Sequence, residues 1–395
     1  MFKNLILNNI KNIILIFLFI FIGIITSLFK GYGDDIDSHA MIHTFIRIIQ
    51  EGLYEPSRFY GYPFAELFYG FFAYFFGSFV SSFISYLFFL SSIVLIYKSY
   101  FKFTFIDYKL LLFVILCFSN PVLYLDNTNP SDAPLSLFLF SLGIYLFKKK
   151  NWTYAALFFA LTISTRANYG LLVYAVILYE VFIQKKIDSK IIKVISICTI
   201  ITALFYYPAF IINKFNLGFI TNPGGPNLDL QSLAPRFIYK TFIAYGVFSS
   251  FAIIIFYFFN LKSVNKNIYK YRLEFLLILL NLLTYFFIPT KTSIISLSTI
   301  LIYLIIFQIT LKKKFIFFLI FLNLFSYVLS YQIFEFKYKY NNPCDPIEAI
   351  DAKFDLKFTK GYFFNRSEKM KMKINCDSKG FKDKSINYMM GKRLR

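Results

Sequence analysis

The chain has 395 residues, 58% of them hydrophobic, and a formal net charge of +21. This apolar content exceeds what a soluble protein of the same length needs. It indicates a polytopic membrane protein, in which each helical span takes about 20 apolar residues. A high positive charge is also typical of nucleic-acid-binding proteins. Here the lysines fall in short runs between hydrophobic segments, as residues that determine membrane topology do, so we expect no nucleic-acid partner.

The apolar segments predict an all-α polytopic membrane protein with about 11 transmembrane helices. The runs lie near residues 10–29, 79–97, 110–125, 133–147, 152–165, 167–183, 191–212, 239–260, 273–288, 294–310 and 315–333. No small-x-small cleavage site follows the first run, so we interpret it as a retained span and not as a signal peptide. Together the runs predict a transmembrane domain over residues 1–333, with a first outer loop over residues 30–78.

Charged residues predict the orientation of these spans. Basic residues gather in five alternate loops, which are therefore expected to be cytoplasmic together with the N-terminus. These residues are Lys98, Lys102, Lys109, Lys148, Lys149, Lys150, Lys185, Lys186, Lys190, Lys193, Lys262, Lys266, Lys270, Arg272, Lys312, Lys313 and Lys314. This pattern allows only one crossing between residues 62 and 98, so we expect residues 63–76 to lie as a helix at the outer interface. We expect an integral protein of the bacterial inner (plasma) membrane.

The C-terminal part, residues 334–395, is polar and rich in lysine. The same orientation makes it a small extracytoplasmic tail or domain. Cys344 and Cys376 both lie in this part of the chain. In an oxidising compartment they could form a disulfide, and two free thiols are an equally open alternative.

The first outer loop concentrates ionisable residues where the chain leaves the membrane. It contains three carboxylates and both histidines of the chain: Asp34, Asp35, Asp37, His39 and His43. From Asp35 onward the spacing predicts an amphipathic helix on which Asp35, the two histidines and Arg47 share one stripe. The apolar residues expected to face the membrane are Ile42, Phe45, Ile46 and Ile49. We therefore expect a helix lying flat, with its polar edge towards a cavity on the extracytoplasmic face.

Asp37 is the candidate general base of this loop. It begins the predicted helix on an adjacent face, where the helix N-terminus could hold its carboxylate. A carboxylate in that position can accept a proton if an acceptor hydroxyl comes within hydrogen-bond reach. Ordinary capping of the helix by Asp34 or Asp35 is the alternative interpretation.

A second set of polar residues is expected on the same side of the membrane: Arg58, Asp132, Arg166, Asn168, Arg236 and Lys291. Arg58 would lie at headgroup level, where a guanidinium either pairs with a phosphate or snorkels to the interface. Arg166 and Asn168 lie within apolar sequence, where a buried unpaired charge is costly and therefore indicates function. Asp132 follows a loop rich in turn formers, so it either lines a cavity or belongs to a tight turn.

Several features in chain order carry a resemblance to a known family. They are a first span; the motif Asp34-Asp35-Ile36-Asp37; the run Gly52, Pro56, Arg58, Gly61-Tyr62-Pro63; the turn Asn129-Pro130-Ser131-Asp132-Ala133-Pro134; and a short span ending in Thr165-Arg166-Ala167-Asn168. The pattern resembles the GT-C superfamily of integral-membrane glycosyltransferases, which includes protein O-mannosyltransferases and the lipid A aminoarabinose transferase. The resemblance covers roughly residues 10–310 by architecture and only short motifs by residue.

The resemblance implies an enzyme that moves a hexosyl or pentosyl group from a polyprenyl-phosphate donor to a hydroxyl of a glycan, lipid or protein acceptor. It implies an Asp of the first outer loop as the base, and the spacing to Gly52 favours Asp37. Ser38 stands where the family often has a second acidic residue, so Asp35 and Asp34 stay candidates. We expect the donor phosphate to be bound by Arg58, Arg166, Arg236 and Lys291, and the acceptor cavity to contain His39, His43, Asp132 and Asn168.

Lys291 stands where relatives often carry an Arg-Tyr pair or a Glu, so the resemblance does not define its role.

The sequence leaves a metal ion and other functions open. A divalent cation, Mg²⁺ or Mn²⁺, could bind between the carboxylates of the first loop and the donor phosphate. A multi-pass transporter or lipid flippase would share the spans and the buried Arg166, although no internal repeat is seen. A non-catalytic membrane protein of envelope assembly would not require the acidic cluster. The sequence identifies neither the sugar nor the acceptor.

Overall fold

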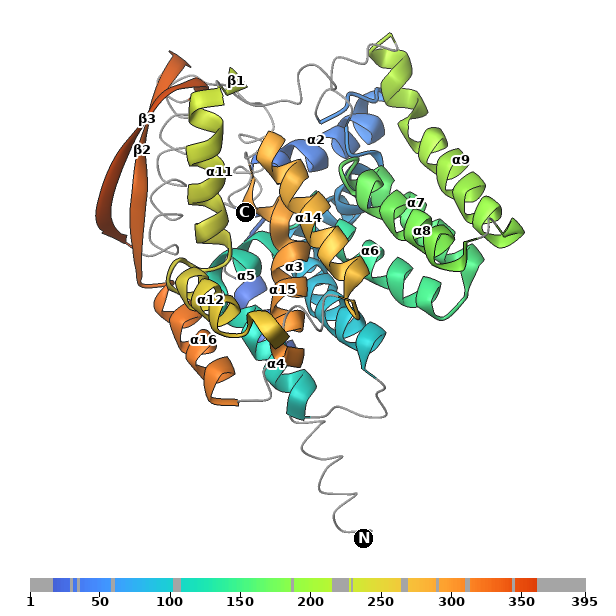
Figure 1. Cartoon of the computed structure of the whole chain (residues 1–395). Coiled ribbons are helices and arrows are strands. Elements are labelled where there is room, and N and C mark those ends of the chain that lie inside the picture. Colours follow the sequence, from blue (N-terminus) through green and yellow to red (C-terminus); the bar gives the residue numbers. More distant parts are fainter. Residues whose placement is uncertain are drawn as a thin grey trace.

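The computed structural model of the chain describes residues 17–28, 31–33, 36–57, 61–101, 108–185, 188–214, 227–228, 230–263, 269–288, 291–309, 313–342 and 345–360. The helices are Phe17–Leu28, α2 (Ile36–Glu51), α3 (Pro63–Tyr100), α4 (Tyr108–Ser119), α5 (Pro121–Asn127), α6 (Asp132–Lys148), α7 (Trp152–Thr165), α8 (Tyr169–Gln184), α9 (Ser189–Ile212), α11 (Leu230–Ala244), α12 (Val247–Phe259), α14 (Arg272–Phe287), the 3₁₀ helix η1 (Thr292–Ile295), α15 (Ser296–Ile309) and α16 (Lys313–Phe325). The strands are β1 (Asn227–Leu228), β2 (Leu329–Asn342) and β3 (Asp345–Lys360). Figure 1 shows α3, α14 and α15 near the centre of the molecule, α9 at one edge and the long strands at the opposite edge.

Several helices are long and apolar enough to cross a membrane, which supports the prediction of a mainly helical integral membrane protein. Within the described residues, three helical stretches qualify by length and composition: Pro63–Tyr100, Ser189–Ile212 and Thr292–Ile309. The number rises to five if each of two bent helix pairs is one span. Shorter apolar helices are Phe17–Leu28, Trp152–Thr165 and Tyr169–Ile183. The larger number of spans predicted from the sequence, and their orientation, stay predictions.

Aromatic and aliphatic side chains from most of the helices form one continuous core. Phe89, Phe113 and Phe140 are fully buried in it. Gly143 of α6 lets Phe159 of α7 approach closely, because a Cβ at this glycine would lie 2.6 Å from the Phe159 ring. Lipid tails are as apolar as these side chains, so close packing between helices is what stabilises such a core in a bilayer.

A break within α3 agrees with the expected division of its sequence. Gly77 has φ 78° and ψ −170°, which is not helical and is readily adopted only by glycine. The helix therefore consists of a first part, beginning at Pro63, and a second part that ends at Tyr100. The break lies between residues 63–76 and residues 79–97, which were predicted as two separate helices, and the interfacial position of the first part stays a prediction.

Two other predicted spans are not continuous helices. Residues 110–125 were predicted as one span, but α4 and α5 meet at Asn120 with a bend of 86°. The stretch 239–260 was also predicted as one span, but α11 and α12 are bent by 91°. Gly246, with φ 86°, caps α12 at this break. An uninterrupted apolar run conceals such a bend, because the residues on both sides of it are buried.

Buried polar side chains join these two breaks. Asn120 Nδ2 donates hydrogen bonds to the Ala244 carbonyl and to the Tyr303 hydroxyl, each at 2.9 Å. The Tyr303 oxygen lies 3.1 Å from the Tyr245 carbonyl and 3.3 Å from Asn323 Oδ1. Backbone groups released by a broken helix must find partners inside the protein. Asn120 supplies the partner of the Ala244 carbonyl, and Tyr303 of α15 supplies the partner of the Tyr245 carbonyl.

The apolar face of α2 does not have the expected environment. Ile42, Phe45 and Ile46 were expected to face lipid, but they are buried. They pack against α3, where a Cβ at Gly70 would lie only 2.0 Å from the Phe45 Cβ. Ile49 is the member of this face that stays exposed. Figure 1 shows α2 lying across one end of the helical bundle, so α2 is fixed to the bundle by its apolar face.

The C-terminal region contains a β-hairpin that the all-α prediction lacked. β2 and β3 pair antiparallel, and the short β1 pairs parallel to β3, in the order β1-β3-β2. The last predicted span, residues 315–333, is wrong in its second half, because α16 ends at Phe325 and β2 begins at Leu329. Alternating residues such as Phe354, Leu356 and Phe358 are typical of a strand. Cys344 and Cys376 lie outside the described residues.

Candidate functional site

Three consecutive residues after α14 connect several distant parts of the chain. Lys291, Thr292 and Ser293 each contact a different ionisable side chain from elsewhere. We use the name polar cluster for these three residues together with their partners Asp37, Asp126, Asp132 and Arg166. The partners come from α2, α5, α6 and the end of α7, and Figure 1 shows α2 across one end of the bundle.

The first contact joins the two ends of the helical region. Lys291 Nζ forms an ion pair with Asp37 Oδ2, although the residues are 254 positions apart. Asp37 lies in the first turn of α2 and is 6% exposed. The N-terminus of a helix favours a negative charge there. Asp37 is therefore a buried carboxylate held by one cation and by the helix it begins.

The second contact is a deeply buried ion pair. Arg166 caps the C-terminus of α7, and its Nε lies 2.9 Å from Oδ2 of Asp132, the first residue of α6. Both side chains are almost completely buried. The Arg166 guanidinium also donates to Ser293, with NH2 at 3.2 Å from the Ser293 hydroxyl. Asp132 and Arg166 were both predicted site residues, and the structure pairs them.

The remaining contacts fix the segment around η1. The Thr292 hydroxyl donates to Asp126 Oδ2 at the end of α5. Asn281 Nδ2 of α14 donates to the Ile294 carbonyl at 2.9 Å. Because side chains from α5, α7 and α14 hold this short segment, the position of Lys291 is determined by the bundle.

The chain before α2 packs closely against the loop that precedes α6. Gly33 has φ +83°, and a Cβ there would lie 2.7 Å from the side chain of Asn129. The Tyr32 ring contacts the His39 ring edge-on at 6.0 Å. His39 is buried and His43 half-buried. Gly33 and Asn129 thus bring the first loop and the predicted turn together, as the shared site requires.

Not all predicted site residues join this group. Asn168 precedes α8, and its buried Oδ1 has no hydrogen-bond partner among the described residues. Arg236 is 9% exposed on α11, a helix that contacts η1. Asp34, Asp35 and Arg58 lie outside the described residues. His39, His43 and Arg47 follow one another on α2 at intervals of four residues, as the predicted stripe requires. Arg47 pairs with Glu51 at 2.9 Å and with Glu55 near the surface.

The structure also shows a buried carboxylate that the sequence interpretation missed. Glu66 of α3 is completely buried and accepts hydrogen bonds from the Tyr54 hydroxyl at 2.8 Å and from the Ser57 and Tyr62 amides at 2.9 and 3.0 Å. Burial and the neighbouring Glu66 carboxylate raise the pKa of Tyr54, so its phenol stays a donor. Glu66 thereby attaches the loop after α2 to α3. Glu66 is the single acidic residue in the apolar stretch 63–76, and a buried carboxylate requires hydrogen-bond donors, so the sequence could have indicated this role.

The chemistry available to the polar cluster is that of two carboxylate–cation pairs. Among the described residues, no three His, Cys, Asp or Glu side chains gather in a way that could hold a metal ion. Comparison of the chain with protein families, curated proteins and solved structures found no match. The functional proposal therefore depends on the residues of the polar cluster and on general chemistry.

Proposed function

We propose that the protein is a membrane glycosyltransferase that moves a sugar from a polyprenyl-phosphate donor to an acceptor hydroxyl, with Asp37 as general base. The observation that carries the proposal is the ion pair of the buried Asp37 with the half-buried Lys291, which places a proton acceptor beside a cation. The site would face the extracytoplasmic side of a bacterial inner membrane. The acceptor would be a glycan, a lipid or a protein.

The reaction needs a base and a cation close together. The acceptor oxygen forms a bond to the anomeric carbon while the bond from that carbon to the phosphate oxygen breaks. The acceptor proton passes to Asp37, and the polyprenyl phosphate leaves with the bonding electrons. Negative charge develops on the leaving phosphate, where a buried cation stabilises it more strongly than in water.

Lys291 would link binding of the donor phosphate to the availability of the base. In the structure its ammonium is paired with Asp37. A donor phosphate next to Lys291 would compete for this ammonium, so the Asp37 carboxylate would become available to the acceptor hydroxyl. The base would then be exposed only when the donor is bound, which would protect the donor from unproductive reaction.

Arg166 fits a positioning role better than direct contact with the phosphate. Its Nε faces Asp132, and both terminal nitrogens donate to Ser293. The charge of Arg166 is thus largely matched by Asp132. We propose that this pair holds Ser293, and through it Lys291 two residues earlier, in place.

A transporter is the second candidate function. Two bent helix pairs meet at the buried contact of Asn120 with Ala244 and Tyr303. Broken helices that meet inside a bundle are typical of transporter substrate sites. Transport would not require a proton acceptor at Asp37.

The test is donor turnover by the purified protein in lipid vesicles. Radiolabelled sugars linked to undecaprenyl phosphate, both hexoses and pentoses, would be added with an extract of membrane glycolipids as acceptor. We expect loss of label from the donor and a decrease of about 10² or more in Asp37→Asn. Asp188→Asn, at a half-buried aspartate before α9, is the matched control and should keep full turnover. Full turnover by a folded Asp37→Asn protein would refute the proposal. Donor movement across the bilayer without cleavage would favour the transporter.

A further inference from the structure

A large cavity lies at the opposite end of the helices that carry the polar cluster. It has a volume of about 620 Å³ and is lined by the last residues of α3 and α6 and the first residues of α4 and α14. α6 begins at Asp132 of the polar cluster and ends at Lys148 of this cavity. Its 17 residues separate the two sites by about 24 Å along the helix. The cavity shares no residue with the polar cluster.

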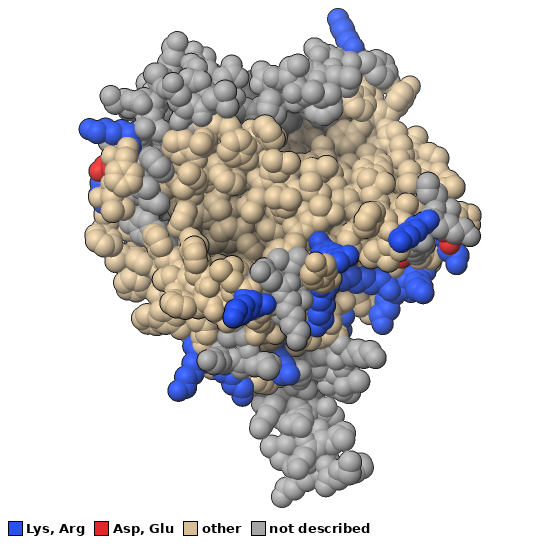
Figure 2. All heavy atoms as spheres, viewed as in Figure 1, with Lys and Arg blue, Asp and Glu red and all other residues tan. Residues whose placement is uncertain are grey.

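The cavity wall is strongly basic. Five lysines line it against two glutamates: Lys109, Lys148, Lys150, Lys270, Lys313, Glu180 and Glu274. Figure 2 shows Lys and Arg gathered along the lower part of the visible face, below a broad surface of uncharged residues. A neighbouring hollow of about 330 Å³ shares Lys148 and adds Lys98 and Lys149. The excess of positive charge points to an anionic ligand.

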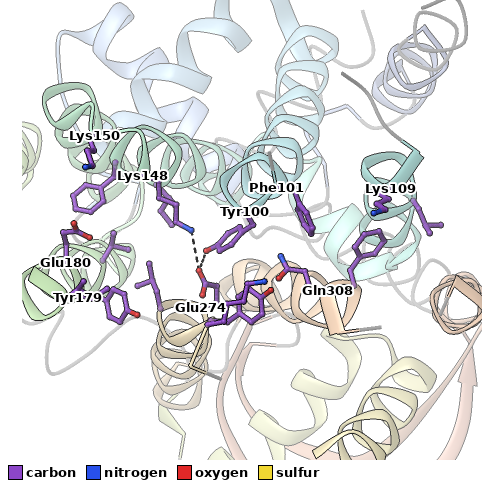
Figure 3. Close-up of a pocket in the computed structure, with 18 of the residues that line it drawn as sticks. Tyr100, Phe101, Lys109, Lys148, Lys150, Tyr179, Glu180, Glu274 and Gln308 are labelled. Carbon is purple, nitrogen blue, oxygen red and sulfur yellow. Dashed lines mark hydrogen bonds and ion pairs between the residues drawn. The ribbon is translucent and has the colours of Figure 1, made fainter. Parts of the chain in front are cut away.

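Two of the five lysines contact other residues that line the cavity. Lys148 Nζ lies 3.6 Å from Glu274 and 3.4 Å from the centre of the Tyr100 ring. The Tyr100 hydroxyl donates to Glu274, which is 3% exposed (Figure 3). Lys313 Nζ lies 4.6 Å from the centre of the Tyr108 ring. Contacts of this kind restrict the side chains of Lys148 and Lys313.

The other part of the wall is apolar and reaches the outer surface of the molecule. Leu112, Ile144, Phe147, Val176 and Ile316 form this part. Ile183 also lines the cavity and is 57% exposed at the end of α8, where Phe182 is 75% exposed. A ligand with apolar chains could therefore enter sideways from the bilayer, while its headgroup meets the lysines.

We propose that this cavity binds an anionic phospholipid of the membrane, with the headgroup phosphate among the lysines and an acyl chain along the apolar wall. Basic pockets between helices at the cytoplasmic surface are suited to such headgroups. The binding site is separate from the polar cluster, so it does not depend on the reaction proposed above. A soluble phosphate compound has no apolar chain that could contact the apolar wall, which opens at Ile183.

Lipid binding can be measured by native mass spectrometry of the purified protein in detergent. The probes are dioleoyl phosphatidylglycerol, dioleoyl phosphatidylcholine and soluble glycerol phosphate. The test variant combines Lys150→Gln, Lys270→Gln and Lys313→Gln. The control combines Lys185→Gln, Lys190→Gln and Lys193→Gln, which removes three charges from exposed residues of α8 and α9 outside the cavity. Lys150 and Lys185 both have positive φ, so the two sets also match in backbone geometry.

We expect the unmodified protein to bind phosphatidylglycerol more tightly than phosphatidylcholine. The cavity variant should bind phosphatidylglycerol at least about tenfold more weakly, whereas the control variant should stay within about twofold of the unmodified protein. Equal losses in both variants would overturn the proposal, because they would show a diffuse attraction to the basic surface. Equal binding of phosphatidylcholine would also overturn it. Tight binding of glycerol phosphate would identify a site for a soluble phosphate and contradict the lipid assignment.

Discussion

At the scale of single residues, the described ion pairs differ in how far their side chains are buried. Arg166 and Asp132 are almost inaccessible, whereas Arg47 and Glu51 pair at the surface. Exposed pairs contribute little, typically less than about 1 kcal/mol. Removing one partner of a buried pair leaves an uncompensated charge and costs about 3–5 kcal/mol. Asp132 and Arg166 therefore carry a structural requirement in addition to any role in the reaction.

We expect Asp132→Leu and Arg166→Met each to destabilise the protein by about 3–5 kcal/mol. The double variant should be more stable than the sum of the two losses indicates, because no charge is left unpaired in it. Thermal unfolding in detergent measures the difference. Arg47→Met is the control and should change the free energy of unfolding by less than about 1 kcal/mol. A melting temperature unchanged by Arg166→Met would show that the buried pair does not stabilise the fold.

At the scale of elements, α2 matters because its first turn contains Asp37. Its position depends on the contact between Phe45 and Gly70, where α2 and α3 approach too closely for any larger residue. A change at this contact would affect the site, since a displaced α2 would separate Asp37 from Lys291. The helix and its polar residues were predictable from the sequence. Its burial against α3 was not, because an amphipathic face looks the same whether lipid or protein covers it.

Gly70→Ala should loosen α2. The added methyl group would meet the Phe45 side chain, so we expect faster hydrogen exchange in peptides from residues 36–51, measured by mass spectrometry. Gly170→Ala is the control, since its nearest neighbour is an Ile163 methyl group at an ordinary 3.7 Å. If α2 exchanges at the original rate in Gly70→Ala, the close approach does not determine its position.

The individual residues of the site could be predicted from the sequence, but their contacts could not. Arg166 was a candidate because a charged residue in apolar sequence is unusual. Asp37 was a candidate because it belongs to the acidic first loop, and Asp132 and Lys291 because they lie in turns expected on the same side of the membrane. Their pairing could not be predicted, since Lys291 and Asp37 are 254 residues apart and no local pattern relates them. Helices were predictable from apolar runs, but the bends at Asn120 and Gly246 depend on partners from α15 and α16. The strand after Phe325 was hidden for a similar reason, because a short apolar run does not distinguish a helix from a strand.

At the scale of the whole molecule, polar groups gather at two separate ends of the bundle. The polar cluster is built from the first residues of α2, α6 and η1, and the lysine-rich cavity from the far ends of α3, α6 and α15. The apolar distance between them, about 24 Å along α6, approaches the roughly 30 Å thickness of a bilayer core. Basic residues prefer the cytoplasmic side. The two ends should therefore face opposite sides of the membrane.

This orientation can be tested with single cysteines in a variant whose four natural cysteines are replaced by serine. Leu53→Cys introduces a thiol in the exposed loop after α2, and Lys190→Cys introduces one at the exposed start of α9. A membrane-impermeant maleimide added to spheroplasts should label the cysteine at position 53 directly and the cysteine at position 190 only after permeabilisation. Labelling of both from outside would contradict the two-sided arrangement. The reverse pattern would place Asp37 towards the cytoplasm, and the extracytoplasmic transfer reaction would then be wrong while both ion pairs and the cavity kept their geometry.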